Sequence, residues 1–187
     1  MAAPPSVRGR CRWFTGLVVW HAIPGALTWG AIGLGLGSIG ASRAALAVAA
    51  VYAVPFGLSE TLGLRLRVPT SRWQVPAHWV AGPNALRRVA VWGVTLGPGL
   101  VTRNPYAGMW MILPLLAAVG NPTAGLEAGV AVGLLHGAMR ASGIAHIAVA
   151  WRGNVHRALM AYFGWRLIDG VMLLGVGVYI GVGLVAG

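Results

Sequence analysis

Ionisable side chains lie within long apolar stretches of this sequence, where charged residues are rare, and six of them are candidates for a binding or gating site. The six are His21, Glu60, Arg103, His136, Arg140 and Asp169. A charge at the centre of a bilayer costs about 2.5–3.5 kcal/mol on insertion scales, so we expect these side chains to face one another or water. Guanidinium groups bind anions, whereas imidazole and carboxyl groups can carry protons. The set favours a small anionic or proton-coupled solute over a bare divalent cation.

Spacing along the chain suggests which of these groups meet. His136 and Arg140 are four residues apart, which places both on one face of a helix. Arg140 and Asp169 lie on consecutive apolar runs and are the first candidate for an ion pair. Arg166 and Asp169 are three residues apart and offer an alternative pair within one helix. These charges either form a binding and gating site or only hold helices together, and the sequence leaves both readings open.

Signatures of catalysis and of cofactor binding are missing from the sequence. It contains no HExxH or GxSxG motif, and no histidine and carboxylate run with metal-ligand spacing. The single cysteine, Cys11, cannot form a disulfide within the chain. We therefore expect no metal and no cofactor, and a membrane-embedded enzyme ranks third, behind a transporter and an accessory subunit.

The composition is that of a membrane protein. Of its 187 residues, 57% are hydrophobic and only 9% are charged, and the mean hydropathy is +0.73. Soluble domains carry about 25% charged residues. All 14 basic residues are arginines, and most of them flank apolar runs, as in cytoplasmic loops. This placement argues against nucleic acid as a partner, despite the net charge of +11.

The apolar runs predict an all-α, polytopic helical bundle with about five transmembrane helices. Residues 1–12 form a cytoplasmic tail, and residues 13–187 form a single transmembrane domain. The expected spans are 13–40, 44–64, 89–120, 123–151 and 158–185. The segments after the second and fourth spans are rich in arginine, so we expect them to be cytoplasmic. This orientation places the N-terminus in the cytoplasm as well. We expect the protein to lie in the plasma membrane.

Proline and glycine pairs interrupt two of the expected spans. The third contains Gly97-Pro98-Gly99, and the first contains Pro24-Gly25. Proline removes a helical hydrogen bond, so we expect a helix break at each position. Broken backbone at membrane depth is tolerated only where protein or a wet cavity covers it. Matching breaks in separate spans are typical of transporter sites.

The residues Trp92-Gly93, Leu96-Gly97 and Gly99-Leu100-Val101-Thr102-Arg103, followed by Ala107, form a glycine-rich pattern seen in actinobacterial membrane proteins. The pattern resembles the cytochrome c biogenesis transmembrane (CcdA/DsbD-like) proteins of the LysE superfamily. The resemblance implies a bundle of about six spans that moves reducing equivalents, ions or small solutes. The paired membrane cysteines of that family are missing, so its redox activity does not carry over. A sixth span would require the 73–83 segment to enter the membrane.

Together these patterns predict a small transporter or permease-like protein in the lipid bilayer, acting on a small-molecule solute. Arg103 and Arg140 would meet a negative group, while His21, His136 and Asp169 would carry protons or gate. The alternative is a structural or accessory subunit of a larger membrane complex. Whether the chain forms a homo-oligomer or joins a partner membrane subunit is left open by the sequence.

Overall fold

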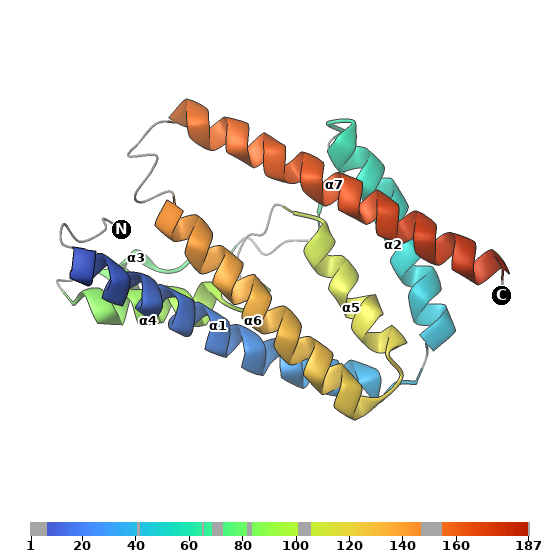
Figure 1. Cartoon of the computed structure of the whole chain (residues 1–187), viewed down its shortest axis with the longest axis horizontal. Coiled ribbons are helices and arrows are strands. Elements are labelled where there is room, and N and C mark those ends of the chain that lie inside the picture. The colour runs from blue at the N-terminus through green and yellow to red at the C-terminus, as the bar shows by residue number, and fades with distance from the viewer. Residues whose placement is uncertain are drawn as a thin grey trace. The chain divides into compact units, whose positions relative to one another are not determined.

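The structure is a computed structural model that describes residues 7–40, 42–64, 66–68, 73–81, 84–100, 106–146 and 155–186. All regular secondary structure in these residues is helical, which confirms the expected all-α class for this part of the chain. The helices in Figure 1 are α1 (Val7–Gly37), α2 (Ser42–Thr61), α3 (Ala77–Val80), α4 (Ala85–Leu96), α5 (Gly108–Ala118), α6 (Pro122–His146) and α7 (Val155–Ala186).

Three of the described helices are long and apolar enough to cross a membrane, as expected for a membrane protein. They are the Arg8–Gly37, Ser42–Thr61 and Leu159–Ala186 segments of α1, α2 and α7. Helix α5 is apolar but shorter. Helix α1 begins at Val7, so residues 7–12 of the expected tail are helical. The third expected span, 89–120, covers most of α4 and all of α5, and the fourth, 123–151, covers α6 except its first residue.

The chain forms two compact units. Unit 1 comprises residues 1–31, 70–104 and 129–158, and unit 2 comprises residues 32–69, 105–128 and 159–187. Helices α1 and α6 each run from one unit into the other. Helices α3 and α4 belong to unit 1, whereas α2, α5 and nearly all of α7 belong to unit 2.

Within unit 1, helices α1 and α6 pack at the distance of backbone contact, and Figure 1 shows them side by side. Three glycines, four residues apart on α6, each lie against the backbone of α1. The contacts are Gly129 with Trp29, Gly133 with Gly25, and Gly137 with His21. Lipid tails are as apolar as leucine, so membrane helices associate through such close packing of small residues.

The expected helix break at Pro24-Gly25 is wrong, because α1 continues through both residues. Proline has no N–H, so the carbonyl of Trp20, four residues earlier, loses its usual helical donor. Gly93 of α4 lies directly against this carbonyl. A neighbouring helix thus covers the freed backbone group, which is how membrane helices tolerate proline.

Helix α4 ends where the sequence has its glycine–proline–glycine run. Its last residue is Leu96, and Gly99 has a φ of +72°, a conformation that favours glycine. The indole Nε1 of Trp29 donates a 2.9 Å hydrogen bond to the carbonyl oxygen of Pro98. This bond fixes the turn after α4 against α1, and both residues are in unit 1.

Unit 2 has a core of small residues that brings α2 and α7 close together. Ala49 and Ala53 of α2 are fully buried and belong to one cluster with Leu173 of α7. A Cβ atom added at Gly57 would lie 2.8 Å from the backbone nitrogen of Leu174. The two backbones therefore approach at the part of α2 that carries its polar residues.

Candidate functional site

The ionisable groups of the two units differ in kind. All five histidines and ten of the fourteen arginines are in unit 1, which contains no acidic residue. All three acidic residues are in unit 2. The candidate site residues therefore form two sets, which are described separately.

In unit 2, Glu60 forms an ion pair between two apolar helices. Its side chain near the C-terminal end of α2 is 1% exposed. The Nε atom of Arg166 on α7 donates a hydrogen bond to its Oε2 atom, at 3.4 Å. The Glu60 Oε1 atom is buried and has no hydrogen-bond partner among the described residues. One oxygen of this carboxyl group is therefore paired, and the other can accept a further hydrogen bond or a proton.

Asp169, one turn further along α7, binds the beginning of α5. The backbone N–H of Gly108 donates a 3.0 Å hydrogen bond to its Oδ2 atom. Gly108 is the first residue of α5, and the first N–H groups of a helix have no partner within it. The positive end of a helix dipole also stabilises an acidic group. Asp169 therefore acts as an N-terminal cap supplied by another helix.

Tyr52 holds the other side of the same peptide group. Its hydroxyl donates a 3.0 Å hydrogen bond to the carbonyl oxygen of Ala107. This carbonyl and the N–H of Gly108 belong to one peptide group, so α2 and α7 hold it from opposite sides. The ring of Tyr52 also stacks on Phe56, with centroids 4.4 Å apart. The start of α5 is thus fixed by side chains from two helices.

We call Tyr52, Glu60, Arg166 and Asp169 the carboxyl cluster. It contains two carboxyl groups and one guanidinium, so full ionisation leaves one negative charge uncompensated within the cluster. The backbone of α7 closes it from one side, since a Cβ atom at Gly170 would lie 2.9 Å from the Cβ of Glu60. In apolar surroundings, such a site can hold and release a proton.

In unit 1, His21 is fully buried in the middle of α1. Its Nδ1 atom forms a 2.8 Å hydrogen bond with the carbonyl oxygen of Leu17. A carbonyl oxygen only accepts, so Nδ1 carries the hydrogen. The Nε2 atom is buried and has no hydrogen-bond partner in the part of the chain that the structure describes.

His136 and Arg140 on α6 lie near His21. The backbone of His21 contacts Gly137, the residue after His136. The three side chains are close enough to interact electrostatically. The Nε2 atom of His136 is likewise buried without a hydrogen-bond partner within the described ranges. We call His21, His136 and Arg140 the histidine cluster.

The sequence-predicted residues are only partly brought together. The pairing of Arg140 with Asp169 stays a prediction, because the two residues belong to different units. Arg166 bonds to Glu60 rather than to Asp169, its neighbour on the same helix. Arg103 lies outside the described residues.

Sequence reasoning missed Tyr52 of the carboxyl cluster and also Gly108, whose N–H binds Asp169 of that cluster. Tyr52 resembles any aromatic residue of a membrane helix, and its sequence context gives no sign of the hydroxyl bond. Gly108 is one of 29 glycines. A signal exists only for Gly108, because a glycine beginning a helix after a proline-containing break can bring its N–H close to an acid.

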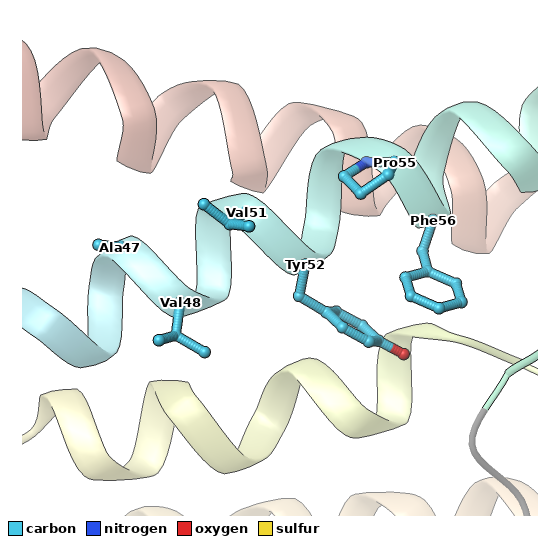
Figure 2. Close-up of a pocket in the computed structure, with 6 residues that line it drawn as sticks. All are labelled: Ala47, Val48, Val51, Tyr52, Pro55 and Phe56. Carbon is cyan, nitrogen blue, oxygen red and sulfur yellow. The ribbon is translucent and has the colours of Figure 1, made fainter.

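A shallow apolar groove of about 460 Å³ lies along α2 (Figure 2). It is lined by Ala47, Val48, Val51, Tyr52, Pro55 and Phe56. The only side-chain polar atom in this lining is the Tyr52 hydroxyl, which is bonded to Ala107. Figure 2 shows Val48 and the Tyr52 ring on the side of α2 that faces α5. Such a lining is typical of a lipid-facing surface rather than of a polar solute site.

Within the described ranges, no group of three or more histidine, cysteine, aspartate or glutamate residues is arranged to hold a metal ion. The fold and the two clusters define a helical protein of membrane type, with buried polar side chains on its apolar helices. No protein-family model, curated protein or solved structure matches the chain. The functional argument therefore rests on the residues themselves.

Proposed function

We propose that this chain is a small plasma-membrane transporter or permease-like protein for a small anionic or proton-coupled solute. The observation that carries the proposal is the ion pair of buried Glu60 with half-buried Arg166, with Asp169 close by at the start of α5. Groups of this kind inside apolar helices are costly, and they commonly mark ion pathways and proton relays. A purely apolar contact would hold α2 and α7 together without that cost.

The proposed topology has five spans, with the N-terminus in the cytoplasm and the third span broken at Gly97-Pro98-Gly99. The end of α4 at Leu96 and the positive φ of Gly99 support the break. Discontinuous spans of this kind place helix termini beside the solute in transporters. The start of α5, held by Asp169, would be one such terminus.

In this proposal the two clusters have different tasks. Arg103 and Arg140 meet the negative group of the solute. Glu60 and Asp169 exchange protons as the transport cycle proceeds, and His21 and His136 carry protons or gate. Arg166 gives Glu60 a partner in the state that the structure shows.

The proposal is tested by flux into proteoliposomes, with inorganic anions and an imposed pH gradient. We expect Arg103→Gln to abolish uptake, because the solute loses its main positive partner, while the protein still elutes as a folded species in detergent. Arg87→Gln is the matched control, since Arg87 is exposed at the start of α4. Normal uptake by the Arg103→Gln variant would show that this arginine does not bind the solute.

A second candidate function is an accessory subunit of a larger membrane complex. It is favoured by α7, whose most apolar stretch is only 17% buried. Purification in mild detergent, followed by mass spectrometry, separates the two functions. A stoichiometric second polypeptide would support the accessory role, whereas a single species of 19.4 kDa or its homo-oligomer would support the transporter.

A further inference from the structure

The histidine cluster presents a hydrogen-bonding atom for which the described residues supply no partner. His21 is 0% exposed, and its Nδ1–H is used by Leu17. In the neutral imidazole, Nε2 is then a bare acceptor. A buried acceptor without a donor is unfavourable, so this atom is suited to a ligand or a proton. Proton uptake would turn Nε2 into a donor.

The surroundings of His21 decide the charge of that ligand. From α6, the groups near it are His136, Gly137 and Arg140. Gly97, the residue after α4, lies against the carbonyl oxygen of His21, and the carbonyl oxygen of Leu17 on the same helix accepts the hydrogen bond from Nδ1. None of these residues is acidic. A guanidinium already supplies positive charge, so a metal cation is disfavoured here and an anion is favoured.

Unit 1 as a whole strengthens this conclusion. It contains ten arginines and no aspartate or glutamate, so no carboxylate of its own can compensate a protonated imidazole. A proton that enters the histidine cluster therefore favours the entry of an anion with it. The combined addition of one proton and one monovalent anion is electrically neutral.

Close backbone packing limits the size of the anion. Gly97, the residue after α4, and Gly137 of α6 both contact the backbone at His21, and a Cβ atom on either would overlap the carbonyl oxygen of His21. The part of α1 that carries His21 is therefore packed at backbone distance on two sides, and the side chain of His21 is itself fully buried. A large organic anion does not suit this position.

We propose that His21, His136 and Arg140 form a binding site for a small monovalent anion of the size of chloride, occupied together with one proton. The proton comes from water and adds to Nε2 of His21, whose new N–H then donates to the anion. No covalent bond to the anion forms. As the substrate site of a transporter, this inference rests on the proposed function, but binding itself can be measured without transport.

The test is binding of radioactive chloride to the purified full chain in detergent, between pH 5.5 and pH 7.5. Uptake of one proton with each anion makes chloride affinity fall roughly tenfold for each unit of rising pH. His21→Gln keeps an N–H donor but cannot titrate, so its affinity should change little with pH. Arg140→Gln should weaken binding at every pH. His146→Gln, exposed at the end of the same helix, should behave as the wild type.

The fold of each variant is checked by size-exclusion chromatography. If His21→Gln does not fold, His136→Gln takes its place and should weaken chloride binding at low pH. Affinity that does not depend on pH in the wild type would overturn the proton uptake, and chloride binding that survives both Arg140→Gln and His136→Gln would overturn the site. Zinc or copper binding that requires His21 would show that the site binds a metal ion and would overturn the anion site. Chloride binding without flux in proteoliposomes would leave the site standing and contradict the transporter instead.

Discussion

At the scale of single residues, the carboxyl cluster shows how polar groups are accommodated inside apolar helices. Glu60 obtains a guanidinium from α7, and Asp169 obtains a backbone N–H from α5. Each acid thus bonds to a different helix. Tyr52 adds a neutral bond to the same peptide group that Asp169 holds.

The contribution of Tyr52 can be measured by removing only its hydroxyl. Tyr52→Phe keeps the ring that stacks on Phe56 but loses the 3.0 Å bond to Ala107. We expect a loss of about 1 kcal/mol, the usual net value of such a bond. Intrinsic tryptophan fluorescence during thermal unfolding in detergent should give a lower midpoint. Tyr179→Phe is the control, because Tyr179 is 81% exposed, and an equal shift in both variants would contradict the role of the bond.

At the scale of helices, contacts between backbones explain why the prolines do not disrupt the fold. Helix α1 keeps its course past Pro24 because Gly93 covers the carbonyl that proline leaves without a donor. Gly129, Gly133 and Gly137 of α6 also lie against the backbone of α1. The paired helices thus depend on the absence of side chains at defined positions rather than on large apolar residues.

This dependence predicts opposite results for two glycines of α6. A Cβ atom at Gly133 would overlap the backbone at Gly25, whereas one at Gly143 would meet nothing within 4 Å. We expect Gly133→Ala to destabilise the protein by about 1–3 kcal/mol through overpacking. Gly143→Ala should be neutral or slightly stabilising, because alanine is the better helix former. Thermal unfolding of both variants under one condition checks the difference, and equal midpoints would refute close packing at Gly133.

Helical structure could be predicted from the sequence, because long apolar runs with few charges have few alternatives in a membrane. Glu60, His21 and Asp169 were identified as candidates for the same reason: an ionisable group is conspicuous in such a run. Their partners could not be predicted. Arg166 is three residues from Asp169, yet it bonds to Glu60, because the rotation of α7 against α2 depends on packing at glycines.

At the scale of the whole molecule, the proposed five-span topology would place the two ends of the chain on opposite sides of the membrane, which can be tested by labelling. Cys11 is exposed, and it is the only cysteine in the sequence. A membrane-impermeant maleimide should label it in inside-out vesicles but not in right-side-out vesicles. Ala186→Cys combined with Cys11→Ser should give the reverse pattern. Labelling of both positions from one side would mean an even number of spans.

The glycines of α6 that contact α1 in unit 1 have a further consequence, which concerns the register of the helix pair. Because Gly129, Gly133 and Gly137 repeat every four residues, a slide by four residues, about 6 Å, would place glycine against α1 again. Backbone fit alone therefore does not select one alignment. The Trp29 indole holds α1 against the turn after α4 through its hydrogen bond to the Pro98 carbonyl, so α6 is the helix of the pair that this bond leaves able to slide.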